Sequence, residues 1–316
     1  MLIKVEFEAP AFSCAIPAVR AELFMRYARY RLFSYEEQEG MALIEIRRLL
    51  SDKRNIFHSF YSEGDFVGFS VVEFLTWDSS HFGMNMGRLH FFSVNFDFPL
   101  DAAIKKVFED SVHAGFCHIS ASIGTKKSLY FNALLKNGFD FLDSKLFYLS
   151  RPFGAERDEA RFSLRDYNDS DYETVCDLIY HADIPSRYSM DATLSAAKVS
   201  RMYIKWAETL LSERSRGGKA AVVIRNSKLA GFAGIREVRF PCSSLNGRLM
   251  GGSFLVCSKN RIGAAYPLVA RGINEGLKVG RAVEFATSID NLPMRRVLLH
   301  LGCEPVFSSY ELRWSS

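Results

Sequence analysis

The stretch FLVCSKNRIGAAYPLVARGINEGLKVG, residues 254–280, decides how the rest of this sequence is interpreted. It opens with the apolar run 254–256, which predicts the end of a buried strand. A polar and basic turn follows at 258–261, and the small residues 263–265 then lead into a helical pattern that ends at Gly280. The stretch therefore predicts a strand, a small-residue turn and a helix in direct succession.

This arrangement is one that binds pyrophosphate. Small residues let the backbone approach an anion closely, and the first turn of a helix offers free N–H groups and the positive end of the helix dipole. Lys259 and Arg261 would add attraction for an anion. The alternative is an ordinary helix start, because a single glycine before a helix is more often required for packing than for phosphate binding.

The composition sets limits on the class of protein. The chain has 316 residues, enough for two domains, and a net charge of +4, which is too small to indicate nucleic acid binding or a membrane surface. No apolar run is long enough to span a membrane, and the N-terminus MLIKVEFEAP has no signal-peptide pattern. The six cysteines form no CxxC pair and no cluster with histidine. We therefore expect reduced thiols, a cytoplasmic location, no structural metal and no membrane insertion.

The first half of the chain predicts a mixed order of strands and helices. Strands are expected at 2–7, 57–61, 66–74, 88–94 and 116–122, and helices at 17–33, 36–50, 100–114 and 126–137. The piece LTWDSSHFGMNMGRLHFFSV is rich in turn residues, and FDFLDSKLFYLS predicts a strand or a tight hairpin up to residue 150. Residues 151–161 are polar and charged and contain Pro and Gly, so they predict a linker.

The second half repeats this order. Strands are expected at 162–165, 219–225, 228–239, 248–256 and 281–287, helices at 170–181, 191–213, 262–279 and 292–301, and a closing strand pair at 304–314. The ends of the halves also match, because each has a helix, a glycine and then an aromatic-rich strand region. The sequence thus predicts a duplicated α/β (α+β) fold with domains at 1–150 and 162–316. Each domain is a mixed, mostly antiparallel sheet flanked by helices, with a parallel pair around the helix 262–279.

The second half resembles the GNAT superfamily of acyl-CoA-dependent N-acetyltransferases. The pyrophosphate motif of that family, Gln/Arg-x-x-Gly-x-Gly/Ala, is matched by Asn260-x-x-Gly263-x-Ala265. The Asn that the family carries after its next strand is matched by Asn291, and Leu298 stands where the family often has a tyrosine. The stretches LTWDSSHFGMNMGRL, RYSMDATL and SSYELRW make the chain similar to the tandem type of the TDP-fucosamine acetyltransferases.

The resemblance implies acetyl-CoA, or another short acyl-CoA, as co-substrate and no metal. Backbone groups of the strand would contact the pantetheine arm, the turn would hold the pyrophosphate, and one further residue would lie at the mouth of the cleft. The cofactor-binding residues implied in this way are Phe254, Leu255, Val256, Asn260, Arg261, Ile262, Gly263, Ala264, Ala265 and Asn291. For Asn291 an additional or alternative role is to cap the following helix.

The resemblance also suggests catalytic residues. Glu237 is the candidate general base, although a solvated glutamate paired with a neighbouring Arg is an equally simple interpretation. With leucine at position 298, Tyr310 is the candidate general acid, and Tyr266 or His300 could replace it. A thiolate leaves with little acid assistance, because the pKa of a thiol is far below that of an alcohol.

The acceptor is expected to be the primary amine of a small molecule, first of all an amino sugar linked to a nucleotide. Trp77, Asp78, Phe82 and Arg187 are the candidate acceptor-binding residues. Tyr203 and Trp206 are three residues apart on one helix face, which favours a place in the core. The first half is expected not to bind CoA, because Asp97 and Asp101 would repel a pyrophosphate.

Two other functions stay open at this stage. The first is acylation of a different amine, such as that of an amino acid or an antibiotic. The second is a binding or regulatory protein that keeps the fold without catalysis, which is suggested by Leu298, Cys303 and Asn260 in motif positions. Nucleic acid is not expected as a partner, and a homodimer is possible.

Overall fold

The computed structural model describes residues 3–6, 10–23, 33–93, 100–150, 162–216, 218–240, 247–258 and 263–315. The chain forms two compact units. The first unit consists of residues 1–144 together with 308–316, and the second unit of residues 145–307. The predicted linker at 151–161 lies outside the described residues, so the predicted domain division remains a prediction.

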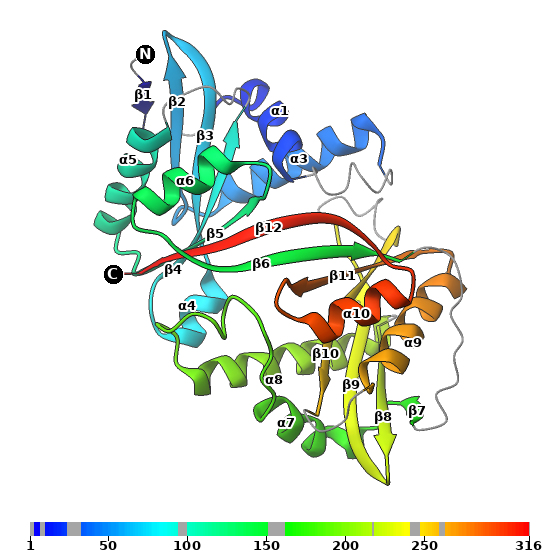
Figure 1. The fold of residues 1–316 in the computed structure, drawn as a ribbon. Helices are drawn as coiled ribbons and strands as arrows, with labels where there is room; N and C mark the ends of the chain where they lie inside the picture. The colour runs from blue at the N-terminus through cyan, green and yellow to red at the C-terminus, as the bar shows by residue number, and fades with distance from the viewer. Residues whose placement is uncertain are drawn as a thin grey trace. The chain divides into compact units, whose positions relative to one another are not determined.

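The sheet of the first unit has the strand order β1-β2-β3-β4-β5-β12 (Figure 1). Neighbouring strands are antiparallel except β4 and β5, which are parallel. The strands are β1 (Ile3–Glu6), β2 (Ile56–Ser62), β3 (Asp65–Phe74), β4 (Met86–Ser93), β5 (His118–Gly124) and the second part of β12 (Glu304–Ser315).

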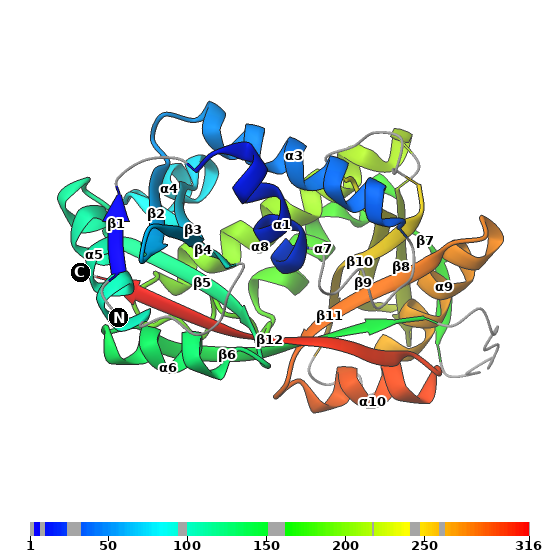
Figure 2. The same ribbon diagram turned by 90° about the horizontal axis from the view of Figure 1, so that it is seen from above.

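Helices cover both faces of this sheet, α1 and α3 on one and α5 and α6 on the other (Figure 2). The buried stripe of α5, with Leu100, Ile104 and Val107, packs with α6 and the sheet into one apolar core. The helices of the unit are α1 (Phe12–Leu23), α3 (Tyr35–Ser51), α4 (Thr76–Phe82), α5 (Leu100–His113) and α6 (Ser128–Lys136).

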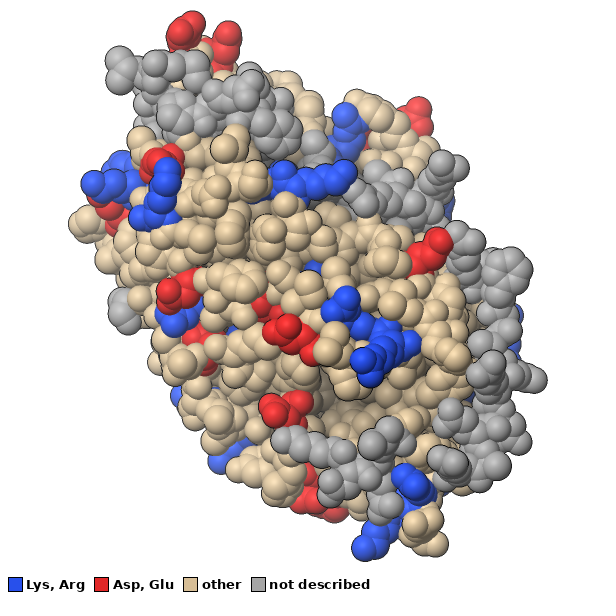
Figure 3. All heavy atoms as spheres, in the orientation of Figure 1, with Lys and Arg blue, Asp and Glu red and all other residues tan. Residues whose placement is uncertain are grey.

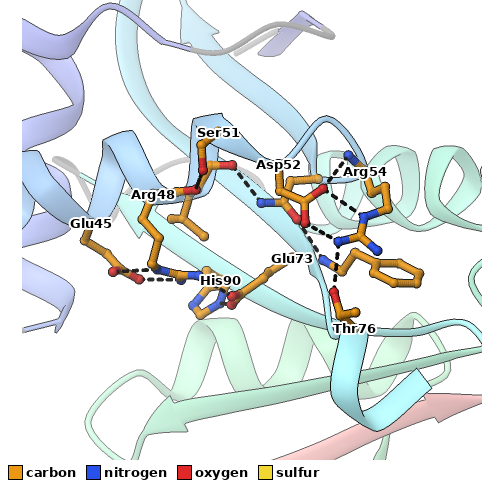
Figure 4. A network of polar contacts seen from close by, with 11 residues as sticks. Glu45, Arg48, Ser51, Asp52, Arg54, Glu73, Thr76 and His90 are labelled. Carbon is orange, nitrogen blue, oxygen red and sulfur yellow. Dashed lines mark hydrogen bonds and ion pairs between the residues drawn. The ribbon is translucent and has the colours of Figure 1, made fainter. Parts of the chain in front are cut away.

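A polar network joins α3 to the sheet of the first unit (Figure 4). Arg48 donates to Glu45 and to Glu73, both at 2.6 Å, and Glu73 also lies 2.8 Å from Nε2 of His90. Although burial raises the pKa of Glu73, the hydrogen bonds from His90 and Arg48 lower it to about 2. The carboxylate is therefore ionised and paired, and the network fixes α3 on β3 and β4.

The second unit has the same plan, with the strand order β7-β8-β9-β10-β11-β6. Here β10 and β11 form the parallel pair, as predicted around the helix that connects them. The strands are β7 (Ser163–Asp166), β8 (Lys219–Arg225), β9 (Lys228–Glu237), β10 (Leu249–Cys257), β11 (Ala282–Ser288) and the second part of β6 (Asp140–Leu149).

Helices again lie on both faces of this sheet. Helices α7 and α8 pack on one face, where Leu210 lies against Gly234, and α9 and α10 pack on the other around Ile273 and Leu298. The helices of the unit are η1 (Asp169–Asp171), α7 (Tyr172–Tyr180), α8 (Ala196–Ser212), η2 (Glu213–Arg216), α9 (Ala265–Lys278) and α10 (Leu292–His300). The mixed α/β architecture predicted from the sequence is confirmed.

Each unit is completed by a strand from the other half of the sequence. Residues 145–149 of β6 pair with β11 of the second unit, and residues 309–315 of β12 pair with β5 of the first unit. The sequence analysis predicted a closing strand pair at 304–314, but this region is the single strand β12. Likewise 140–149 is one strand rather than a hairpin.

The turn-rich piece after β3 contains a helix that the periodicity does not indicate. Residues 76–82 form α4, which ends at Gly83 in the left-handed conformation with φ 74°. The N–H of Gly83 donates to the carbonyl oxygen of Ser79. A helix of seven residues is too short to display an amphipathic pattern, so only the cap glycine could have indicated it.

The surface charges, the helix lengths and the possible metal ligands bear on the expectations from the sequence. On the face that Figure 3 shows, basic and acidic side chains are scattered among uncharged ones. In the part of the chain that the structure describes, no helix combines the length and apolarity needed to cross a membrane. Among the same residues no three His, Cys, Asp or Glu side chains gather as metal ligands would.

The buried His58 predicts a loss of stability in acid. Its side chain is 0% exposed, and Nε2 lies 3.0 Å from Oδ2 of Asp110. Burial lowers the pKa of His58, and this outweighs the opposing effect of Asp110. The neutral imidazole thus contributes stability that is complete above its unfolded pKa of about 6.5 and is lost as the pH falls toward the folded value.

Thermal denaturation between pH 8 and pH 5 measures this contribution. The melting temperature of the wild type should fall more steeply with decreasing pH than that of His58→Gln. His181→Gln serves as the control, because the His181 side chain is 70% exposed and should leave the slope unchanged. Parallel curves for the wild type and His58→Gln would contradict the assignment.

Candidate functional site

The parallel strands of the second unit separate halfway along their length. β10 and β11 are paired only from Leu249 to Gly251 on one strand and from Ala282 to Glu284 on the other. Beyond this point β10 continues along β9, whereas β11 continues along β6. Their backbones thus open into a V, and the helix α9 follows the open end of β10.

A bulge in β10 lies at the start of this opening. The register between β10 and β9 shifts between Gly252 and Phe254, so that Ser253 is an extra residue on β10. A side chain at Gly252 would collide with Phe285 of β11, since an added Cβ would lie 2.4 Å from the phenylalanine ring. Gly252 therefore allows Phe285, which is 5% exposed, to pack at the point where the strands diverge.

The bulge determines where the backbone N–H groups of β10 point. The N–H of Ser258 donates to the carbonyl oxygen of Ala230 in β9 at 2.9 Å. Because direction alternates along a strand, Val256 and Phe254 also direct their N–H groups toward β9. The N–H groups of Leu255 and Cys257 consequently point to the other side, into the V. Sequence reasoning named Phe254, Leu255 and Val256 together and could not distinguish them, because the bulge that fixes the alternation has no sequence signal beyond Gly252.

The described end of the turn after β10 consists of small residues that lead directly into α9. Gly263 has φ 91°, a value that favours glycine, and its carbonyl oxygen accepts from the N–H of Tyr266 at 3.1 Å. Ala264 is 1% exposed, and α9 begins at Ala265 without a side-chain cap and without an acidic residue in its first turn. The N-terminal N–H groups of α9 are thus not matched by a protein carboxylate of that turn. Asn260, Arg261 and Ile262 lie outside the described residues.

The cysteine at the end of β10 has a thiol whose pKa is raised by burial. Burial raises the pKa of the Cys257 thiol to about 12, and the same cause raises that of Cys303 to about 12. Both thiols are therefore protonated near neutral pH, and a thiolate is the form that attacks. A reaction at this site would have to proceed without a covalent intermediate on either cysteine.

Glu237 is the last residue of β9. It lies opposite Met250, which is near the end of β10 that is away from the turn and where β10 and β11 are still paired. Its carboxylate is 34% exposed and lies 3.8 Å from Nη1 of Arg281. The contact supports the interpretation as a solvated, paired glutamate, and the partner is Arg281 rather than a neighbouring Arg of its own strand.

The predicted residues around α10 have structural roles. Asn291 caps α10, since its Oδ1 accepts from the N–H of Met294 at 3.3 Å. Leu298 is 0% exposed and belongs to the core between α9, α10 and the sheet. Tyr266 is 7% exposed in the same core, with its ring 5.7 Å from His300.

Tyr310 belongs to the first unit. Its ring packs 4.4 Å from that of Phe131 and 6.1 Å from that of Phe141, at the edge of the apolar core. The structure therefore does not bring Tyr310 together with β10 and α9 within the second unit. Sequence position alone assigned it to the second half, because the exchange of terminal strands could not be foreseen.

The predicted acceptor residues of the first half lie on α4. Phe82 is 3% exposed, so its side chain is part of the core and does not line a surface cleft. Trp77 is 43% exposed, and its ring stacks on His81 at 5.0 Å with the planes 4° apart. Asp78 occupies the first turn of this helix. Of these predicted residues, Trp77 presents the largest apolar surface.

Arg187 lies in the turn between α7 and α8 of the second unit. Its Nη2 donates to the hydroxyl of Tyr188 at 2.8 Å, and its guanidinium carbon lies 4.7 Å from the centre of that ring. The Tyr188 ring in turn contacts Trp206 at 5.7 Å, and a chain of rings continues through Tyr203 to Phe254. Arg187 is thus connected to the bulge of β10 by packed aromatic side chains.

The corresponding strands of the first unit separate as well, and an aromatic side chain of β4 packs into the core at this level. β4 and β5 are paired from Met86 to Leu89 and then diverge, and the register between β3 and β4 has no shift. Phe91 lies in this region and packs against Phe60 and Tyr130, each at 5.6 Å. Asp101 stands in the first turn of α5, paired with Lys136 at 3.3 Å, and Asp97 lies outside the described residues.

Comparison with known proteins identifies the fold. No protein-family model matches the sequence, and no curated protein matches it. Over 99% of its length the structure is similar to a GCN5-related N-acetyltransferase from Sphaerobacter thermophilus, of which it covers 95%, with a TM-score of 0.60 and 11% identity. A GNAT-family acetyltransferase from Colwellia psychrerythraea matches with a TM-score of 0.52 and 11% identity, over 99% of this chain and 100% of that one.

A third similar structure is that of a tandem protein. It is a tandem GNAT protein from the clavulanic acid biosynthesis pathway, with a TM-score of 0.50 and 14% identity, and 99% of this chain and 98% of that chain are covered. Together with the repeated strand order, these likenesses show that the chain has a GNAT fold in tandem. At identities this low, structural similarity establishes the fold, and the activity has to be inferred from the residues of the site.

Proposed function

We propose that the protein is an acyl-CoA-dependent N-acyltransferase with one active site, in the second unit, and acetyl-CoA as the first expected acyl donor. The observation that carries the proposal is the combination, among the described residues, of the bulge in β10, the positive φ of Gly263 and the start of α9. It combines two N–H groups directed into the V, those of Leu255 and Cys257, with the positive φ of Gly263 and a helix N-terminus free of acidic side chains in its first turn.

These residues fit the chemical parts of an acyl-CoA. The N–H groups of Leu255 and Cys257 would hold the amide groups or the carbonyl oxygen of a thioester, and the turn that includes Gly263 would hold the pyrophosphate. In the reaction the amine nitrogen forms a bond to the thioester carbon, the carbon–sulfur bond breaks, and the amine proton is lost to a base. The protein positions the reactants and stabilises the oxyanion, which are large contributions to such reactions.

The proposed acyl transfer needs little help from an acid or a base of the protein. The thiol leaves without a strong acid, so the buried Leu298 does not prevent turnover. Glu237 remains our candidate for a base that acts through water, because it is 34% exposed in the second unit. Tyr310, whose ring packs against Phe131 in the first unit, stays a candidate for the general acid and is given no step here.

The first unit is proposed to support the fold without binding CoA. Phe91 and Tyr130 occupy the region where β4 and β5 diverge, and Asp101 places a negative charge at the start of α5. Both features oppose a pyrophosphate and a pantetheine arm in this unit. One acyl-CoA per chain is therefore expected.

The acceptor we test first is the amine of a nucleotide-linked amino sugar, as the resemblance of the sequence suggests. Amines of amino acids and antibiotics come next. They are the alternatives that the sequence left open, and one similar structure is a tandem GNAT protein from the clavulanic acid biosynthesis pathway. A cytoplasmic location is consistent with an intracellular acyl-CoA pool and remains part of the proposal.

The function is tested by following thiol release from acetyl-CoA in the presence of a panel of primary amines. The panel contains a UDP-linked amino sugar, free amino acids and aminoglycosides. Release that depends on both the amine and the protein, and that is absent in Gly263→Asp, is the expected result. Acetyl-CoA binding without release for any amine would contradict catalysis and favour a binding protein, to which the absence of the usual tyrosine at Leu298 also points.

A further inference from the structure

An aromatic ring lies at the closed end of the V in the second unit. β10 and β11 are paired up to Gly251 and Glu284. The next residue on each strand, Gly252 on β10 and Phe285 on β11, is the first of the opening. A Cβ added to Gly252 would lie 2.4 Å from Cδ1 and 2.7 Å from Cε1 of the Phe285 ring. The ring of β11 therefore reaches across to β10 at the point where the two strands part.

The Phe285 ring is held in place by the core of the second unit. Its side chain is 5% exposed and belongs to the apolar cluster that the sheet forms with α9 and α10. Tyr148 of β6 lies directly opposite Phe285 in the register and is buried in the same cluster. Side chains in a close-packed core interdigitate with few voids. The ring can therefore move away from β10 only if its neighbours in the core move as well.

The glycine at position 252 is explained by the space that this ring takes. Its φ lies outside the left-handed region, so the backbone conformation does not require a glycine there. A glycine within a strand often marks a place where another group approaches the backbone closely, and here that group is the Phe285 ring. The pair of a glycine on β10 and a phenylalanine on β11 thus determines how deep the V is.

An acyl-CoA bound as proposed above directs its acyl group toward this ring. Its pyrophosphate lies at the Gly263 turn, outside the open end of the V, and its pantetheine arm passes the N–H of Cys257 and then that of Leu255. The thioester follows the last amide of the arm at a distance of about two residues of an extended strand, which rises about 3.3 Å per residue. The thioester therefore reaches the bulge that follows Gly252, and the acyl carbons beyond it face Phe285.

The closed end of the V restricts the length of such an acyl group. Past the opening the two strands are hydrogen-bonded at Gly251 and Glu284, so a chain cannot pass between them. An acetyl group ends at the first carbon beyond the carbonyl, whereas every further methylene extends toward the ring. A longer chain has to displace a side chain that is packed in the core, and this is unfavourable. The overlap grows with each carbon that is added.

We propose that Phe285 sets the length of the acyl group that the protein accepts and restricts the donor to acetyl-CoA and acyl-CoAs of similar size. This inference rests on the proposed acyl transfer in the second unit, and it names the residue that selects the acyl group. Phe285 acts by the space that its ring occupies and takes no part in making or breaking bonds. Leucine in its place leaves room for a slightly longer chain, and alanine leaves room for a longer one still.

The experiment is a calorimetric titration of the wild type, Phe285→Ala, Phe285→Leu and Leu301→Ala with free CoA, acetyl-CoA, butyryl-CoA and hexanoyl-CoA. Leu301 is the matched control, because it is 5% exposed in the same apolar cluster and belongs to neither strand of the V. The quantity compared is the ratio of the Kd of each longer acyl-CoA to that of acetyl-CoA. A general loss of stability affects all donors alike and leaves this ratio unchanged. No amine acceptor is needed.

We expect the wild type to bind acetyl-CoA at least about tenfold more tightly than hexanoyl-CoA. In Phe285→Ala the two Kd values should lie within about threefold of each other, because the ring that the longer chain meets is gone. Phe285→Leu should bind butyryl-CoA like acetyl-CoA and still discriminate against hexanoyl-CoA. Leu301→Ala should keep the ratio of the wild type, and free CoA should bind all four proteins equally.

Three results would each overturn the inference while the acyl-CoA site stands. They are equal binding of acetyl-CoA and hexanoyl-CoA by the wild type, an unchanged ratio in the Phe285 variants, and the same change of ratio in Leu301→Ala. If Phe285→Ala does not fold, Phe285→Leu with butyryl-CoA decides the question. Failure of the wild type to bind free CoA and every acyl-CoA would instead end the proposed function, and this inference with it.

Discussion

Replacing Gly263 by Asp should abolish acetyl-CoA binding while the protein stays folded. Gly263 has φ 91°, and a side chain at this position would extend from the backbone just before α9 begins. The carboxylate would bring a negative charge to the helix N-terminus, where the pyrophosphate is proposed to bind. A Kd increase of at least about 100-fold, which corresponds to about 2.7 kcal/mol, is expected by calorimetric titration.

Gly280→Asp provides a matched control for this substitution. Gly280 lies just after the other end of α9, has φ 68° and has open space around its Cα. The two variants therefore share the added charge and the cost of a non-glycine residue at positive φ, about 1–2 kcal/mol. Gly280→Asp should bind acetyl-CoA like the wild type. Binding that survives in Gly263→Asp, or that is lost equally in both variants, would contradict the placement of the site.

Removing residues 308–316 should unfold the first unit, although these residues are more than 150 positions away from most of its sequence. The segment pairs with β5 from Ser309 opposite Gly124 to Ser315 opposite His118. It also contributes Leu312, which is 0% exposed in the apolar core of the unit. Without it β5 loses a neighbouring strand and the core loses one of its walls. Circular dichroism and heat denaturation of the truncated chain should show the loss.

A point substitution measures the contribution of β12 to the stability of the first unit without removing the strand. Leu312→Ala should lower the free energy of unfolding by about 2–5 kcal/mol, because it leaves a cavity in the core. Leu299→Ala is its control, since Leu299 is 53% exposed and its truncation should change stability by no more than about 0.5 kcal/mol. Equal stability of the two variants, or a truncated chain with an intact first unit, would refute the assignment of β12 to this unit.

Local sequence signals were sufficient for most of the elements. The apolar run before the small-residue turn identified β10 and α9, and the glycines after α6 and α10 marked helix ends. Gly138 and Gly302 indeed have φ 84° and 73°, as helix-ending glycines do. Asn291 was interpreted as a helix cap on the same basis, and its bond to Met294 confirms that role. These features depend on neighbours within a few residues, so the sequence alone could reveal them.

What the sequence could not reveal depends on distant parts of the chain. The exchange of β6 and β12 between the two units leaves no local mark, and it assigns Tyr310 to the first unit. Phe82 was a candidate acceptor-binding residue and helical spacing favoured a core position for Trp206, whereas their exposures are 3% and 36%. In each case the packing of other elements decides the outcome, and a pattern of apolar residues does not specify which surfaces those elements cover.

The most direct measurement is a calorimetric titration of the wild-type protein with acetyl-CoA. The structure of the second unit predicts one binding site per chain, because the N–H groups of β10, the Gly263 turn and the start of α9 occur together there. A stoichiometry of one, with binding lost in Gly263→Asp, is the predicted result. No binding would contradict the acyl-CoA site, and two sites per chain would contradict the assignment of the first unit as a support.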